Sequence, residues 1–202
     1  MDESSKQKGL TPDLWFATPI WSRKVVDFER INRDLLVVQQ ELEASSSSSV
    51  QRSNVGGWHS EDQLHQLPPF QEIAQIIGST CAACAVHMAF DFTKYELVIK
   101  EMWLNKNDLG DFNRNHLHPN SILSGTYYIA TPASCGNIEL YDPVAARMMS
   151  LYPMGGDPAS NRHTVVYPAD AGSLLIFPSW LQHAVPPNRS NESRVSLSFN
   201  FS

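Results

Sequence analysis

The sequence contains no long hydrophobic run, no basic cluster and few cysteines, and each of these absences narrows the class of protein. No stretch approaches the ~18 apolar residues of a transmembrane helix, and the polar start, MDESSKQKGL, lacks an apolar signal-peptide core. A net charge of −6 without clustered lysine or arginine argues against a nucleic-acid groove. Three cysteines, an odd number without an export signal, are typical of a reducing compartment. We therefore expect a cytoplasmic protein that binds neither nucleic acid nor membrane.

The size of the chain favours one domain. Its 202 residues are 42% hydrophobic, which is enough for one sizeable core and little more. Residues 1–10 are mostly polar, so we expect them to form a disordered tail. Residues 11–202 are then expected to form a single domain. Nothing in the sequence indicates the oligomeric state.

The N-terminal half is expected to contain one strand and two helices. Aromatic and β-branched residues over 14–26 favour a strand that is interrupted at Pro19. Apolar residues recur at helical spacing over 27–43, and the serines at 45–49 predict a flexible loop after that helix. A second helix is expected over 69–90, because two prolines mark its start and an apolar face follows.

From residue 96 onward the pattern changes to short apolar or alternating runs separated by proline, glycine, asparagine and aspartate. Such runs predict strands joined by turns. Two helices followed by about eight strands predict a mainly β fold, a jelly roll with the N-terminal helices packed outside the sheet. The runs lie at 96–104, 122–130, 137–141, 163–167, 173–177, 182–185 and 193–201.

His116, His118 and His183 are the candidate metal ligands, with His163 in reserve. Residues i and i+2 of a strand point to the same face, so His116 and His118 could both bind one metal. His183 lies in a later run, where an apolar strand leads through Pro178 back into a β-segment. Three neutral imidazoles bind first-row divalent metals and leave coordination positions open for other ligands.

The three-histidine set leaves the metal open. Three histidines and a water molecule also form a catalytic zinc arrangement. A non-haem Fe(II) oxygenase normally uses two histidines and one carboxylate, and His118 stands where that carboxylate is expected. A neutral third ligand would leave an Fe(II) site one negative charge short and raise its attraction for an anionic co-substrate. Alternatively, Glu139 or Asp142 completes the metal site in place of His118.

Arg194 is the candidate anion-binding residue. It begins a final alternating run in which Arg194 and Ser196 share one face, whereas Val195, Leu197 and Phe199 share the other. On the solvent side this would be an ordinary polar face. Facing inward, the arginine would be a costly buried charge unless it is paired. A carboxylate of a bound dicarboxylic acid would supply that partner, and Ser196 would add a hydrogen bond.

At these residues the chain resembles the 2-oxoglutarate/Fe(II)-dependent oxygenase superfamily. Members of that superfamily carry a His-x-Asp pair, a distal histidine and then an arginine, often as Arg-x-Ser. Here His116-x-His118, His183 and Arg194 occupy the same order. The third residue of the first motif is a histidine where the superfamily has an aspartate, so the identity of the third ligand is the point in doubt.

The closer resemblance is to a branch of these oxygenases known mostly from marine bacteria and phages. It covers nearly the whole chain after residue 12. The most specific stretch is HLHPNSILSGTYYI at 116–129. Shorter stretches are LWFATPIW at 14–21, GGWHS at 56–60 and WLN at 103–105.

The resemblance implies a cupin-like double-stranded β-helix with Fe(II) at its open end, and 2-oxoglutarate as co-substrate. The metal ligands would be the three histidines named above. The distal carboxylate of 2-oxoglutarate would meet Arg194 and Ser196. Prolyl-hydroxylase-like relatives add a tyrosine on the strand after the first ligands, and by analogy Tyr128 is the candidate here, with Ser124 on the same face.

The implied activity is that of a dioxygenase that uses O₂ to hydroxylate a small metabolite or a peptide, with release of succinate and CO₂. Asn105 and Asn115 would be polar positioning groups in the site. Because His118 replaces the usual carboxylate, two alternatives stay open. One is a three-histidine cupin-like enzyme that does not use 2-oxoglutarate, and the other is a non-catalytic jelly-roll binding module. The sequence does not indicate the primary substrate.

Overall fold

The structure, a computed structural model, describes residues 16–46, 49–144, 146, 149 and 162–202. The tail predicted at 1–10 lies outside the described residues. The elements follow one another as β1 (Trp21–Lys24), α1 (Phe28–Ser45), β2 (Asn54–Val55), β3 (Trp58–His59), the short helices η1 (Leu64–Gln66) and η2 (Pro68–Phe70), α2 (Gln71–His87), β4 (Ile99–Asn107), β5 (Phe112–His116), β6 (Leu123–Ala130), β7 (Ile138–Tyr141), β8 (Thr164–Tyr167), β9 (Ser173–Pro178), β10 (His183–Val185) and β11 (Arg194–Phe201).

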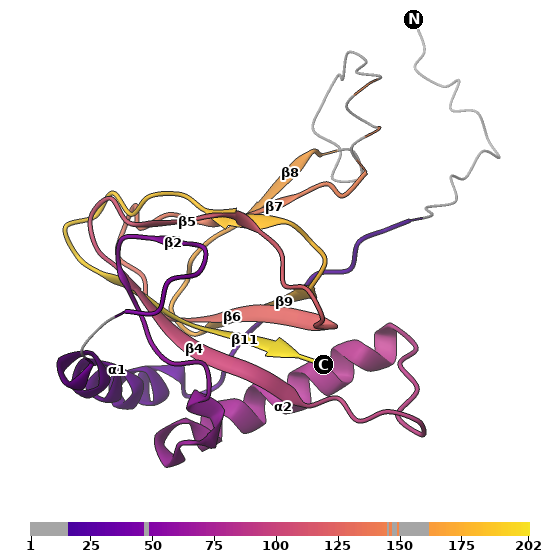
Figure 1. The fold of residues 1–202 in the computed structure, drawn as a ribbon, viewed down its shortest axis with the longest axis horizontal. Coiled ribbons are helices and arrows are strands. Elements are labelled where there is room, and N and C mark those ends of the chain that lie inside the picture. The colour runs from indigo at the N-terminus through magenta and orange to yellow at the C-terminus, as the bar shows by residue number, and fades with distance from the viewer. Residues whose placement is uncertain (1–15, 47–48, 145, 147–148, 150–161) are drawn as a thin grey trace, which may run out of the picture.

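The strands form two sheets that face each other (Figure 1). A six-stranded sheet has the order β1-β9-β6-β11-β4-β3, and a five-stranded sheet has the order β2-β5-β10-β7-β8. From β4 onward, most successive strands lie in different sheets, and their pairs are antiparallel. This is the double-stranded β-helix that the sequence predicts, and both helices pack outside the six-stranded sheet.

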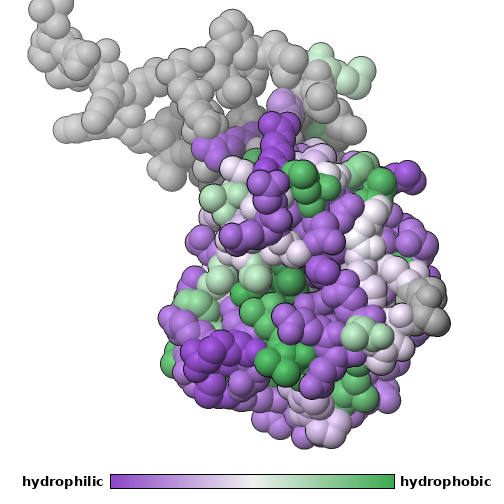
Figure 2. Space-filling view, turned by 90° about the vertical axis from the view of Figure 1, so that its left-hand side faces the viewer, coloured by the Kyte–Doolittle hydropathy of each residue, from purple (hydrophilic) through white to green (hydrophobic). Residues whose placement is uncertain are grey.

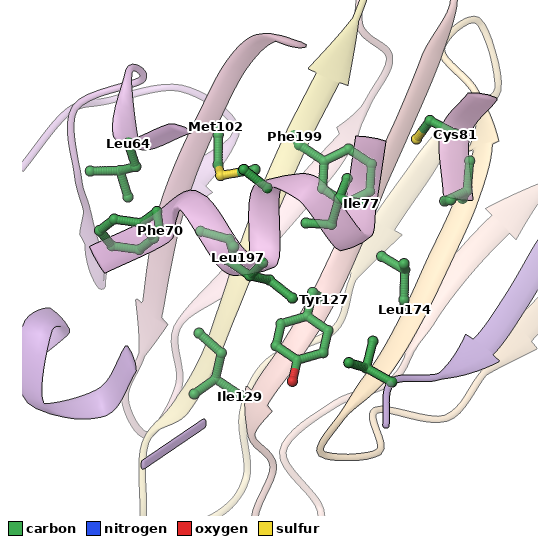
Figure 3. Close-up of a cluster of buried hydrophobic side chains, with 14 of the residues drawn as sticks. Leu64, Phe70, Ile77, Cys81, Met102, Tyr127, Ile129, Leu174, Leu197 and Phe199 are labelled. Carbon is green, nitrogen blue, oxygen red and sulfur yellow. The ribbon is translucent and has the colours of Figure 1, made fainter. Parts of the chain in front are cut away.

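The main hydrophobic core lies between the two helices and the outer face of the six-stranded sheet. Alternation along β11 sends Leu197 and Phe199 to this face, where they meet Phe70 and Ile77 from the helical layer (Figure 3). Tyr127 joins them from β6, and its hydroxyl donates a hydrogen bond of 2.6 Å to the side chain of Asn32 in α1. The face of the molecule in Figure 2 is mostly hydrophilic, with smaller hydrophobic areas between the polar residues.

The space between the sheets is partly apolar and partly open. A second buried cluster fills one region, with Leu140 from β7 and Phe177 from β9 among its members. The remaining inter-sheet space is a cavity of about 510 Å³. The inner face of the six-stranded sheet therefore lines a cavity, whereas its outer face packs in the main hydrophobic core.

Some elements differ from the prediction. The N-terminal strand is confined, within the described residues, to Trp21–Lys24, and the second helix ends at His87, where Ala89 takes a left-handed conformation with φ of 56°. The strand Phe112–His116 is not among the predicted runs, because its central residues, asparagine, arginine and asparagine, are polar. It forms because β10 and β2 pair with it. None of the described helices is both long and apolar enough to cross a bilayer.

Candidate active site

Three histidines come together between the sheets. His116 is the last residue of β5, His183 is the first of β10, and the two are direct partners in the antiparallel ladder, with ring centroids 4.2 Å apart. The Nε2 atom of His118 lies 3.3 Å from that of His183. One ligand atom from each ring falls within 4.8 Å of the others. The predicted juxtaposition of the three candidate ligands is therefore present.

The route by which His118 reaches the group differs from the prediction. It lies beyond the end of β5 rather than inside a strand, so strand alternation does not place it. Its backbone N–H donates a hydrogen bond of 3.0 Å to the carbonyl of Ser179, the residue after β9. Asn120, with φ of 61°, turns the chain immediately afterwards. A turn and a backbone contact hold His118, not the β-pleat.

The spacing and the hydrogen bonds fit a first-row metal ion. Metal–nitrogen bonds of about 2.0–2.1 Å place neighbouring ligand atoms roughly 3 Å apart, close to the separation of His118 and His183. Nδ1 of His116 lies 2.7 Å from the carbonyl of Arg114, and Nδ1 of His183 lies 3.0 Å from that of Leu181. A carbonyl only accepts, so both rings carry the proton on Nδ1 and turn an Nε2 lone pair toward the group.

Burial keeps the three rings neutral. It lowers the pKa of His116, and it lowers that of His118 to about 4, with the neighbouring charge of His116 as a further cause. The pKa of His183 falls to about 3, again through burial first and then through the two other histidines. At neutral pH, lone pairs rather than protons are therefore available to a metal.

The alternative carboxylate ligands are not at this group. Glu139 is the residue next to Leu140 in β7, and its carboxylate accepts a hydrogen bond of 2.7 Å from the Tyr141 hydroxyl. Asp142 accepts a bond of 2.9 Å from the backbone of Val144. Neither lines the cavity, nor does the reserve ligand His163. Among the described residues, the only group with converging metal-ligand atoms is the three histidines.

Arg194 lies in the same cavity and is buried, with 2% of its surface exposed. Its guanidinium donates hydrogen bonds to the carbonyl of Cys135 at 2.5 Å and to Oδ1 of Asn107 at 2.8 Å. Within the described part of the chain, no carboxylate forms an ion pair with it. A buried cation without an anion is unfavourable, and burial lowers its pKa accordingly. The donor set fits a bound carboxylate.

The predicted neighbours of Arg194 are only partly as expected. Ser196 and Tyr128 line the cavity and are partners across β11 and β6. Ser124 lies four residues from Tyr128 on β6, which is roughly 13 Å along a strand. Its hydroxyl instead contacts Ser179 and Asn200 at 2.7 Å, and it does not line the cavity. Ser124 therefore cannot share one carboxylate with Arg194, and this part of the prediction is corrected.

Asn105 and Asn115, the two predicted polar positioning residues, do line the cavity. Three further lining residues escaped the sequence reasoning. Trp103 leans on His118 at 5.9 Å between centroids, and its other neighbour, His59, stacks on it at 5.5 Å. Glu101 precedes it on the same inward row. Alternation along 99–107 could have revealed this row.

The comparisons with known proteins agree with the site. Residues 101–200 match the family model described as "Putative 2OG-Fe(II) oxygenase". The matched segment holds all three histidines and Arg194. No curated protein matches the chain, so the predicted branch from marine bacteria and phages stays a prediction.

Solved structures share the fold. A prolyl-4-hydroxylase from Pseudomonas putida superposes with a TM-score of 0.65 at 15% identity, over 91% of this chain and 92% of that one. HygX from Streptomyces hygroscopicus, with nickel and 2-oxoglutarate bound, gives 0.62 at 11% identity, over 92% and 83%. The viral collagen prolyl hydroxylase from Paramecium Bursaria Chlorella virus-1, a 2-oxoglutarate complex, gives 0.56 at 10% identity, over 90% and 95%.

The family match, together with a jelly roll that holds a histidine metal group and a buried arginine in one cavity, indicates a 2-oxoglutarate-dependent, non-haem Fe(II) oxygenase. The family model covers residues 101–200, close to half of the chain. The protein is therefore an enzyme with Fe(II) as cofactor and 2-oxoglutarate as co-substrate. This counts against both sequence-based alternatives, the cupin-like enzyme without 2-oxoglutarate and the non-catalytic module.

Proposed function

We propose that this oxygenase hydroxylates a C–H bond of a small molecule or a peptide. In the overall reaction, substrate, O₂ and 2-oxoglutarate give hydroxylated substrate, succinate and CO₂. The observation that carries the proposal is the presence, in one cavity, of a convergent set of metal-binding nitrogens and a buried arginine without an anionic partner.

His116, His118 and His183 would hold the iron through ring nitrogens. Two of these rings are already oriented by backbone carbonyls, so they need little reorganisation to bind. Phe177 packs against His183 at 4.7 Å between centroids and shields that side from water. When bound, the iron supplies the activation of O₂ and the oxidative decarboxylation of the co-substrate.

Arg194 would hold the distal carboxylate of 2-oxoglutarate. Two of its N–H groups already bond to Cys135 and Asn107, so the guanidinium is fixed before the anion arrives. Ser196 and Tyr128 would add hydroxyl hydrogen bonds from the two strands next to it. Burial raises the pKa of Tyr128, so its hydroxyl stays protonated and able to donate. We assign Ser124 no role in this subsite.

The substrate would enter where β2, β5 and the start of β4 border the cavity. Arg52 and Asp62 line this region and form an ion pair of 2.8 Å. Asn113 and Arg114 of β5 line it as well. Such a polar border is compatible with a hydrogen-bonding substrate, either a small molecule or a peptide.

The proposal is tested under anaerobic conditions with metal-free protein, to which Fe(II) and then 2-oxoglutarate are added. A visible charge-transfer band is expected in the wild type. In Arg194→Ala the band should require far more 2-oxoglutarate, while Fe(II) binding is retained. Arg189→Ala removes an exposed arginine outside the cavity and serves as the matched control. Absence of a band in the wild type despite bound iron would contradict the proposal.

A further inference from the structure

The third histidine of the site has a different environment from the other two. Nδ1 of His116 and of His183 each meets a backbone carbonyl, but Nδ1 of His118 does not. Its nearest polar partner is Nδ2 of Asn200 on β11, at 3.4 Å. Since a metal-binding histidine needs its other nitrogen oriented by an acceptor, something must take the part of the carbonyl at His118.

A buried chain of hydrogen bonds fixes the Asn200 amide beside His118. The Ser179 and Ser124 hydroxyls are 2.7 Å apart, and Ser124 donates a bond of 2.7 Å to Oδ1 of Asn200. Nδ2 then donates a bond of 2.7 Å to Oε2 of Glu101. Ser179, Ser124 and Asn200 are each at most 2% exposed, so water does not compete for the hydrogen bonds between them. All donors in the chain can therefore point toward one end, the Glu101 carboxylate.

This arrangement sets the metal-free state of His118. Because the amide nitrogen of Asn200 faces it, Nδ1 of His118 accepts, and the proton of this ring sits on Nε2. That Nε2 lies 3.3 Å from Nε2 of His183, whose lone pair can accept the proton in a hydrogen bond. To bind a metal through Nε2, His118 must carry its proton on Nδ1 instead. A proton there needs an acceptor, and the acceptor tethered to the same Asn200 nitrogen is Glu101.

We propose that Glu101 is a positioning residue for His118: tethered by Asn200, its carboxylate orients the imidazole and accepts the Nδ1 proton of the metal-binding form. The proposal rests on the proposed function, in which His118 is a metal ligand. It also accounts for the missing charge of the three-histidine set. Other oxygenases bind the metal directly through a carboxylate. Here the carboxylate, on β4, would instead accept a hydrogen bond from the metal ligand His118.

The test uses Co(II) alone, titrated into metal-free protein and followed by its visible absorption. Glu101→Gln keeps the shape but removes the negative acceptor, so we expect its Co(II) affinity to fall about 10- to 100-fold. The absorption bands should also change, because the orientation of one ligand changes. Glu139→Gln, the same substitution on β7 outside the cavity, should match the wild type in both readouts.

Glu101→Asp distinguishes a carboxylate role from a packing role. If the negative acceptor matters, Asp retains more Co(II) affinity than Gln. If only the shape matters, the isosteric Gln is the better replacement, and that order would overturn the proposal. Should Glu101→Gln fail to fold, Asn200→Ser removes the tether and should also weaken Co(II) binding, and an unchanged affinity would overturn it.

The two proposals fail in different ways. If the wild type does not bind Co(II), the proposed metal site is contradicted, and the proposed role of Glu101 is contradicted with it. Tight binding in the wild type together with unchanged affinity and spectrum in Glu101→Gln would overturn only the positioning role and leave the metal site intact.

Discussion

The two faces of the six-stranded sheet carry opposite kinds of residue on the same strands. On β11, Leu197 and Phe199 face the helices and are fully buried among apolar side chains. Arg194, Ser196 and Asn200 of the same strand face the cavity or the hydrogen-bonded chain beside it. One face therefore supplies stability and the other supplies chemistry, and mutations on the two faces should separate these two quantities.

The largest difference between the effect on stability and the effect on co-substrate binding is expected for a mutation on the core face. Phe199→Ala should lower the free energy of unfolding by about 3–5 kcal/mol, because it leaves a cavity between β11 and the helices. Urea denaturation measures this. The protein that remains folded should bind 2-oxoglutarate with its normal affinity. A large loss of that affinity without loss of stability would show that the faces are not independent.

On the cavity face the pattern should be reversed. Arg194→Met should weaken 2-oxoglutarate binding by about 2–3 kcal/mol, or roughly 30- to 150-fold, because a charge-assisted contact is lost. Its stability without ligand should fall much less than that of Phe199→Ala, since a buried unpaired cation is removed together with its hydrogen bonds. Calorimetric titration and urea denaturation provide the two numbers. Equal losses of stability in the two variants would contradict the comparison.

Acid should lower the stability of the metal-free protein through the histidines that line the cavity. The pKa of His118 is lowered to about 4 and that of His183 to about 3, from an ordinary 6.5. At a pH between 6.5 and the lowered pKa of each histidine, the unfolded chain binds a proton that the folded chain does not. The contribution of these histidines to the stability of the metal-free protein is therefore complete above pH 6.5 and is lost as the pH falls toward 4 and 3. We expect about 1–2 kcal/mol per histidine between pH 6.5 and 5. Urea midpoints should fall less steeply with acid in His183→Gln.

The smallest effect is expected at Ser196. Its hydroxyl would contribute one hydrogen bond to the co-substrate, so Ser196→Ala should weaken 2-oxoglutarate binding by about 1 kcal/mol, or roughly fivefold. Stability should hardly change. Ser198→Ala, two residues along the same face, is the control, since its hydroxyl accepts a hydrogen bond from Asn105. A larger effect on 2-oxoglutarate binding at Ser198 than at Ser196 would misplace the proposed carboxylate site.

The jelly roll was predictable because most of its strands alternate or are apolar. The same alternation that placed Arg194 and Ser196 on one face extends to Asn200, so that residue could have been named from the sequence. The strand Phe112–His116 could not, since its polar centre has no strand pattern of its own and depends on pairing with β10.

Contacts between distant segments account for the remaining differences. His118 reaches the metal group through a turn and a bond to the Ser179 backbone, and a strand-based argument selected it for a different reason. Ser124 shares a face with Tyr128 but stands at the other end of it. The contacts that link Glu101, Asn200 and His118 join three separate segments, and no spacing along the chain predicts them.

The double duty of β11 also bears on how such an enzyme can diversify. Any change of register or twist that serves a new substrate at this strand would disturb the helical core behind it, so β11 has little freedom to vary. The border formed by Arg52, Ser53 and Asn113 has no buried apolar residue to preserve. Evolution, or a library aimed at new substrates, would find its tolerant positions there, while the sheet with two occupied faces stays constant.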